Sequence, residues 1–199
     1  MQKYIVALTG ASGVVYGIRL TVELLARNYE VHLICSKAAC IVLEQELDWN
    51  FEDSLEKTFR KHLPHENLFL YENSDIAAPL ASGSFLTDGM VVIPCTMASV
   101  SALAQGSSGN LLERAADVVL KEKRPLIIVP RETPLNSIHL RNMLLLSEMG
   151  THIIPAMPAF YHKPKNIDDM VSFLVGKVLD AMHVSHDIFK RYKQPNAGE

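Results

Sequence analysis

Short apolar runs without polar interruption recur along this chain, and each is followed by a segment with a helical period. Continuous apolar runs are typical of strands buried on both faces of a parallel sheet. The expected strands span 4–8, 31–35, 90–93, 126–129 and 152–155, with a short edge strand at 68–71. The expected helices span 13–28, 37–47, 52–63, 97–105, 110–122, 136–149 and 167–182. This alternation predicts an α/β fold, an open parallel sheet with helices on both faces, and a ligand site at the carboxyl ends of its strands.

The length and composition suit one domain, expected over 1–185, followed by a C-terminal tail over 186–199. Hydrophobic residues make up 48% of the chain, enough for a sizeable core, and a net charge of -3 without a long basic run argues against nucleic-acid binding. No apolar run reaches the roughly 18 residues of a membrane span, and the N-terminal stretch is too short for a signal peptide. Three cysteines without CxxC spacing argue against a disulfide framework or a structural zinc site and favour the cytoplasm.

The first two expected strands end in small residues. Thr9-Gly10-Ala11-Ser12-Gly13 follows the first strand, where backbone N–H groups at a helix start favour an anion such as a phosphate or a flavin edge. The glycines fall at 10, 13 and 17, which is not GxGxxG spacing, and the second strand ends in Cys35-Ser36-Lys37 without an acidic residue. Both departures argue against NAD. The alternative is a tight turn in which Ser12 only caps the helix.

Two further strand ends carry polar groups. Thr96 and Ser99 lie at an expected helix start, facing the first glycine-rich turn, where their hydroxyls suit phosphate oxygens or simple N-capping. Arg131 and Glu132 follow the strand at 126–129, and they suit phosphate binding and proton transfer, with a surface ion pair as the alternative.

The loop after the last strand, 155–164, contains three prolines and two adjacent aromatic residues, Phe160 and Tyr161. Their rings suit packing against a flat ring of a ligand. His162 is expected to be a structural hydrogen-bonding residue rather than a catalyst. The histidines show no metal-ligand spacing, so no metal site is predicted.

Several segments together resemble the UbiX/Pad flavin prenyltransferases. They are TGASG, SKAA at 36–39, ASGS at 81–84, ERAADVVLKEKRPLIIVPRETP at 113–134 and PAFYHKP at 158–164. The resemblance implies a Rossmann-like (flavodoxin-like) protomer, often assembled into a dodecamer. It also implies that reduced FMN is alkylated by dimethylallyl phosphate at N5 and closed at C6. The product, prenylated FMN, serves a UbiD-type decarboxylase, and no metal is needed.

The resemblance also assigns residues. FMN contacts would be Gly10, Ala11, Ser12, Ser36, Thr96, Met97, Ala98, Ser99 and Arg131. Dimethylallyl phosphate contacts would be Tyr161 and Lys177, with Arg114 and Lys121 adding charge within the chain or across a subunit boundary. The catalytic polar residues would be Ser12, Glu46 and Glu132. Ile76 and Tyr192 stand where some members carry tryptophan, and Lys177 stands where some carry arginine.

The sequence leaves three competing functions open. A flavin-dependent cysteine decarboxylase would carry PASANT where this chain reads PCTMAS, and would have a catalytic histidine after the first helix that this chain lacks. Direct decarboxylation of aromatic acids would need a carboxylate site, and the sequence offers no separate one. A non-catalytic flavin carrier would need no second phosphate site, which argues against it because Tyr161 and Lys177 suggest one.

Overall fold

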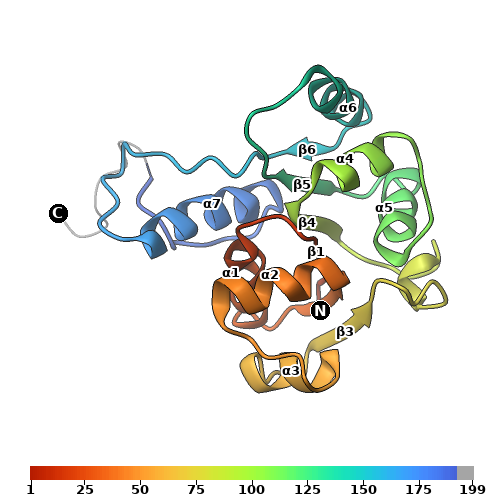
Figure 1. The fold of residues 1–199 in the computed structure, drawn as a ribbon, viewed down its shortest axis with the longest axis horizontal. Coiled ribbons are helices and arrows are strands. Elements are labelled where there is room, and N and C mark those ends of the chain that lie inside the picture. Colours follow the sequence, from red (N-terminus) through yellow and green to blue (C-terminus); the bar gives the residue numbers. More distant parts are fainter. Residues whose placement is uncertain (192–199) are drawn as a thin grey trace.

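The computed structural model describes residues 1–191 and forms one parallel sheet of six strands. The strands are β1 (Lys3–Leu8), β2 (Glu30–Cys35), β3 (Leu68–Glu72), β4 (Gly89–Cys95), β5 (Leu126–Pro130) and β6 (His152–Ile153). They lie in the order β3-β2-β1-β4-β5-β6, which is the order of a Rossmann sheet (Figure 1). The expected fold class is therefore confirmed.

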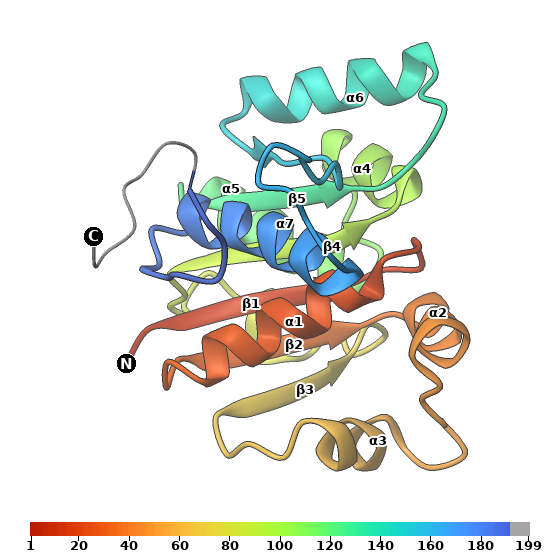
Figure 2. The ribbon, with the colours of Figure 1, turned by 90° about the vertical axis from the view of Figure 1, so that its left-hand side faces the viewer.

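The helices cover both faces of the sheet, as expected. They are α1 (Val14–Leu25), α2 (Lys37–Leu47), α3 (Leu55–His62), α4 (Met97–Ala104), α5 (Leu111–Lys121), α6 (Ser137–Glu148) and α7 (Ile167–Ala181), with a 3-10 turn at Pro79–Ala81. Tyr4, Val6 and Leu8 pack with α1 and α7 on one face, whereas Ile5 and Ala7 pack with α4 and α5 on the other (Figure 2). Alternate residues of β1 therefore supply two separate cores, as strand geometry requires.

Most helices begin at a residue whose side chain caps them. The side-chain oxygens of Ser36, Ser54, Thr96, Asn110, Asn136 and Asn166 each accept a backbone N–H in the following turn. Helix α1 differs, because its N-cap is Gly13, which has a left-handed φ of 95° and no side chain. Strand β6 is shorter than expected, although the N–H groups of Ile154 and Ala156 still donate to the carbonyls of Ile128 and Pro130 in β5.

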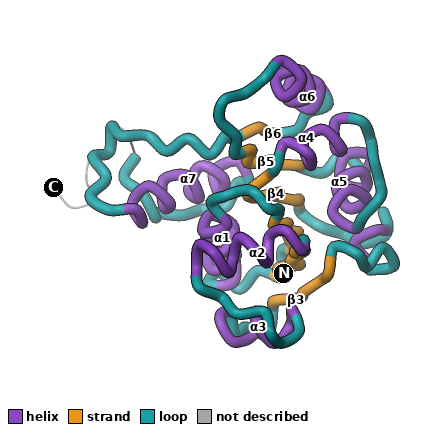
Figure 3. Tube along the Cα trace, in the orientation of Figure 1, coloured by secondary structure: helices purple, strands orange, loops and turns teal. Residues whose placement is uncertain are grey.

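The strand order reverses between β1 and β4, and the loops that follow these strands lie at one edge of the sheet (Figure 3). This point is where open α/β sheets place their ligands. The segment that follows α7 packs back on the C-terminal half of this helix. Phe189 packs against Gly176, and Arg191 forms an ion pair with Asp180 at 2.6 Å. The remainder of the predicted tail, 192–199, lies outside the described residues. Within residues 1–191, no helix is both long and apolar enough to cross a membrane.

Candidate functional site

The loops after β1 and β4 are joined by a buried threonine. The Thr9 hydroxyl donates to the carbonyl of Pro94 at 2.7 Å and accepts the N–H of Thr96 at 3.0 Å. The loop after β5 joins them, because the N–H of Arg131 donates to the carbonyl of Cys95 at 3.2 Å. Three predicted segments therefore form one continuous rim at the switch point.

Two glycines allow the elements of this rim to approach closely. A Cβ on Gly10 would overlap the Cβ of Ala38 in α2, and a Cβ on Gly17 would overlap Leu8 and the carbonyl of Ile93. Gly10 therefore brings the β1 loop against the start of α2, and Gly17 brings α1 down onto β1 and β4. These contacts explain the spacing at 10, 13 and 17 without a dinucleotide fingerprint.

The start of α1 is held by Glu46 from the last turn of α2. Its carboxylate accepts the N–H of Gly13 at 2.9 Å and the N–H of Val14 at 3.2 Å. A negative charge at this position is also favoured by the helix dipole. The alternative in which Ser12 caps α1 is wrong, since Ser12 is exposed and the cap has no side-chain hydrogen bond. Ser12 therefore lies in the loop that the resemblance assigns to the flavin, and Glu46 lies beside that loop.

Ser36 and Thr96 hold the starts of α2 and α4. Ser36 Oγ accepts the N–H of Ala39 at 3.1 Å, and Thr96 Oγ1 accepts the N–H of Ser99 at 3.1 Å. Thr96 is therefore the N-cap of α4, which was the alternative to phosphate binding. It leaves the N–H groups of Met97 and Ala98 at the helix start without an intrahelical acceptor, so an anion can still be received there.

The side chain of Arg131 has a buried nitrogen without a hydrogen-bond acceptor among the described residues. Its Nε is buried and has no hydrogen-bond partner within residues 1–191. It lines a cavity of about 250 Å³ together with Glu132, Pro155 and Met157. Glu132 is exposed and accepts the N–H of Thr133 at 3.0 Å, and no ion pair joins it to Arg131 in the described chain. The ion-pair alternative is therefore not what the structure has.

The loop after β6 carries its aromatic residues to α7. The rings of Tyr161 and Phe173 meet edge to face at 5.7 Å, and Lys177 is exposed one turn further along the same helix. The prediction that His162 makes structural hydrogen bonds is wrong: its ring stacks on Phe173 at 5.1 Å, and both buried ring nitrogens lack a partner in the described residues. His162 is structural through packing.

The two basic residues assigned to α5 lie near opposite ends of that helix. Arg114 is exposed in the first half of the helix, and Lys121 ends it, 3.3 Å from Glu122 and close to Gly83 in the segment before β4. Lys121 is therefore at the opposite, amino edge of the sheet. Ile76 is 56% exposed before the 3-10 turn, and Tyr192 lies outside the described residues.

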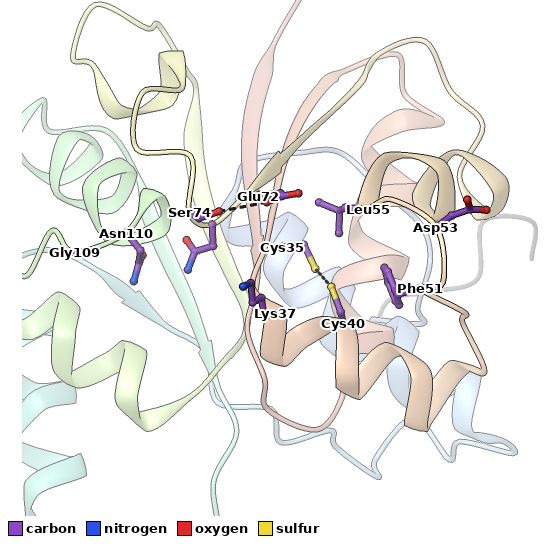
Figure 4. A pocket seen from close by; sticks show the side chains of 11 residues that line it. Cys35, Lys37, Cys40, Phe51, Asp53, Leu55, Glu72, Ser74, Gly109 and Asn110 are labelled. Atoms are coloured by element: carbon purple, nitrogen blue, oxygen red, sulfur yellow. Dashed lines mark hydrogen bonds between the residues drawn. The ribbon is translucent and has the colours of Figure 1, made fainter.

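One cavity was not predicted from the sequence. It holds about 560 Å³ between β2, α2 and the start of α5, and it is lined in part by Cys35, Lys37, Cys40, Asn73 and Asn110 (Figure 4). Asn73 ties the end of β3 to α5 by accepting the N–H of Leu112 at 2.8 Å. The asparagine directly after the edge strand was the available signal. In residues 1–191, no group of three or more His, Cys, Asp or Glu side chains could hold a metal ion.

Known proteins share this fold and much of this sequence. A family model described as Flavoprotein matches residues 1–179. A flavin prenyltransferase UbiX of Alkalihalophilus pseudofirmus is 54% identical over 194 residues, covering 94% of each chain. A dodecameric FMN-dependent UbiX-like decarboxylase from Escherichia coli is 42% identical with a TM-score of 0.87, covering 97% of this chain and 100% of that one. A UbiX protein (AnUbiX) in complex with FMN and dimethylallyl pyrophosphate is 38% identical with a TM-score of 0.88, covering 98% of this chain and 99% of that one.

A Rossmann-like sheet with helix starts gathered at its switch point, matched by the Flavoprotein family over 1–179, defines the chain as a flavoprotein. The identity over nearly the full length narrows that class. The chain belongs to the UbiX family of flavin prenyltransferases. The resemblance carried by the TGASG, SKAA and PRETP segments is thereby confirmed.

Proposed function

We propose that this chain is a flavin prenyltransferase that moves a dimethylallyl group from dimethylallyl phosphate to N5 and C6 of reduced FMN, yielding prenylated FMN. The observation that carries the proposal is the continuous rim formed at the β1/β4 switch point, with Glu46 on the start of α1 and Arg131 bonded to the end of β4. The similarity to a UbiX protein solved with FMN and dimethylallyl pyrophosphate supports FMN and a dimethylallyl donor as substrates, and the monophosphate is the donor that the family resemblance implies.

The rim offers different chemistry to the two ends of FMN. The carboxylate of Glu46 already takes the first N–H groups of α1, so a phosphate placed there would meet a negative charge. The start of α4, at Thr96, Met97, Ala98 and Ser99, and the unpartnered Nε of Arg131 suit the phosphate end. Gly10, Ala11, Ser12 and Ser36 would then lie along the rest of the flavin, with Ser12 and Glu46 nearest its reacting edge.

The reaction needs charge and proton handling more than a metal. Reduced FMN supplies the electron-rich N5 and C6 atoms. The allylic C–O bond of dimethylallyl phosphate breaks with its electron pair leaving on phosphate, and new bonds form to N5 and then to C6. N5 and C6 each lose a proton. One proton is added to the double bond of the prenyl group as the bond to C6 forms, and Ser12, Glu46 and Glu132 would pass the other to the departing phosphate. Cationic side chains would stabilise that phosphate as it leaves.

The prenyl-donor residues favour an assembly. Tyr161 lies against α7 and Lys177 lies on it, whereas Arg114 and Lys121 lie on α5, and the two helices cover opposite faces of the sheet. We therefore place the donor site between copies, with one copy supplying α7 and others supplying α5. The exposed apolar side chains on and beside α6, Ile138, Leu140, Leu144, Leu145 and Met149, suit contacts between copies. A homododecamer is proposed because the Escherichia coli relative is described as one.

Two finer assignments complete the proposal. The product is handed to a UbiD-type decarboxylase, since prenylated FMN is a cofactor rather than an end product. The protein acts in the cytoplasm, which the small number of cysteines favours.

The test is anaerobic incubation of the protein with reduced FMN and dimethylallyl phosphate, followed by mass spectrometry of the extracted flavin. The expected flavin gains one dimethylallyl unit in place of one hydrogen. An unmodified flavin that stays bound would indicate a carrier. Loss of carbon dioxide from an added aromatic acid or cysteine peptide, with the flavin unmodified, would indicate a decarboxylase.

A further inference from the structure

Two thiols that the proposed reaction does not use lie face to face beside the flavin rim. Cys35 is the last residue of β2 and is 3% exposed, and Cys40 ends the first turn of α2 and is half-buried. Their sulfur atoms are 3.7 Å apart, and their side chains point toward one another (Figure 4). Ser36 lies between them in the chain, at the cap of α2.

The pair is reachable from outside the protein. Both cysteines line the cavity of about 560 Å³, next to Lys37, Phe51 and Leu55. A small oxidant that enters this cavity meets Cys40 first, because Cys35 is the more buried of the two. Cys95 has no such position, since it is fully buried in β4.

The electrostatics assign different roles to the two thiols. The hydrogen bond between the sulfurs raises the pKa of Cys35 and lowers the pKa of Cys40, although burial and the charges of Glu44 and Glu72 oppose ionisation of Cys40. Burial raises the pKa of Cys95 to about 12. A half-buried thiol of lowered pKa beside a second, protonated thiol is the arrangement that reacts with peroxides and then forms a disulfide.

We infer that Cys35 and Cys40 form a redox pair that a hydroperoxide converts to a disulfide, and that this disulfide weakens flavin binding. The Cys40 thiolate attacks the O–O bond, which releases an alcohol or water and leaves a sulfenic acid on Cys40. The Cys35 thiol then attacks that sulfur and expels water. The two thiols lose two electrons to the peroxide, and a small dithiol reverses the reaction.

The effect on flavin follows from which element can move, and this step rests on the proposed function, in which Ser36 contacts FMN. A disulfide must shorten the sulfur separation from 3.7 Å to about 2.05 Å. Cys35 is fixed between Leu8 and Glu72 in the sheet, whereas α2 buries only Ala39 and Leu43. The first turn of α2 therefore moves. The side chain of Ser36 moves with this turn, because its Oγ accepts the N–H of Ala39, while its backbone N–H stays bonded to Leu8.

The disulfide is tested on the full-length, reduced protein treated with hydrogen peroxide. Thiol titration after denaturation should fall from three thiols to one, and peptide mapping should link Cys35 to Cys40. Cys35→Ser should trap a sulfenic acid on Cys40 that dimedone labels, while Cys95→Ala should form the same disulfide as the parent. The inference would be overturned if all three thiols survived or if the disulfide involved Cys95. It would also be overturned if dimedone labelled Cys35 in Cys40→Ser but did not label Cys40 in Cys35→Ser.

The coupling is tested by titrating FMN into the reduced, oxidised and re-reduced protein. Oxidation should weaken FMN binding by up to about tenfold, the scale of one lost hydrogen bond, and dithiothreitol should restore it. Peroxide should leave FMN binding by Cys40→Ser unchanged. Equal affinity of the reduced and disulfide forms would overturn the coupling. Failure of both forms to bind FMN would instead overturn the proposed function, with the disulfide itself standing on the thiol titration.

Discussion

Replacing Glu46 tests the most specific contact of the site, because its carboxylate is the cap of α1. Helix α1 begins at Gly13, which has no side chain, and the N–H groups of Gly13 and Val14 both donate to Glu46. In Glu46→Ala these two donors lose their acceptor, and the helix start loses its negative charge. Gln45→Ala is a matched control, since Gln45 is the exposed neighbour on the same helix.

The expected cost is that of a lost N-cap, about 1 kcal/mol, with up to about 1 kcal/mol more from the helix dipole. The lower half of that range is expected because Glu46 is exposed to solvent, which weakens both terms. For a chain of this size, about 1 kcal/mol lowers the melting temperature by roughly 2–4 °C. Glu46→Gln keeps an acceptor oxygen, so it should lose less stability than Glu46→Ala.

Urea unfolding of Glu46→Ala, Glu46→Gln and Gln45→Ala measures these differences directly. Sulfate should stabilise Glu46→Ala more than the parent protein, because the anion can occupy the helix start that the carboxylate has left. Turnover adds a separate readout: if Glu46 also moves protons, Glu46→Gln should lose about 10²-fold in rate while keeping most of its stability. Equal stability of Glu46→Ala and Gln45→Ala, without selective rescue by sulfate, would refute the capping argument.

The other predictions concern the ligands and the core. Glu132→Gln should bind FMN normally and turn over about 10²-fold more slowly, and unchanged turnover would remove it from proton transfer. Tyr161→Phe and Lys177→Ala should weaken dimethylallyl phosphate binding by about ten- to a hundredfold with FMN affinity kept, while Arg131→Ala should weaken FMN first; paired titrations decide this. The free energy of unfolding should fall as pH drops below about 6.5. Burial lowers the pKa of His32 in the folded protein, so below this pH the His32 imidazole takes up a proton in the unfolded chain before it does so in the folded one. Urea melts between pH 7 and 5.5 should show this slope, and His32→Phe should flatten it.

The fold was predictable because nearly every strand is a continuous apolar run. In β1, β2, β4 and β5 almost every residue is buried, since helices cover both faces of the sheet, and such runs leave a clear signal. The 3-10 turn at Pro79–Ala81 was missed because the segment between β3 and β4 has no apolar period. The segment after β6 keeps two backbone hydrogen bonds to β5, from Ile154 and Ala156, so the apolar run located this strand correctly and overestimated only its regular part.

The sequence predicted which loops form the rim of the site, because the carboxyl ends of parallel strands lie at the same side of the sheet. It did not predict which side chains in those loops contact one another. Glu46 reaches Gly13 across 33 residues, and only the packing of α2 against the β1 loop brings them together. Cys35 and Cys40 are five residues apart, a spacing with no meaning in a helix or a strand alone. They meet because a strand ends and a helix begins between them.

The family resemblance assigns four residues to the dimethylallyl phosphate site, and the positions of the cationic ones show that a single copy of the chain does not bring them together. Arg19 contacts Asp168 at 2.9 Å, so α7 begins beside the early part of α1, near the flavin rim. Lys177 comes ten residues after Ile167 in this helix, which puts it about 15 Å from that start. Lys121 lies at the amino edge near Gly83, on the other face of the sheet. Sequence motifs record the residues that meet in an assembly, whereas a single fold places only the residues that meet within one copy, so the donor site proposed here is completed by neighbouring copies.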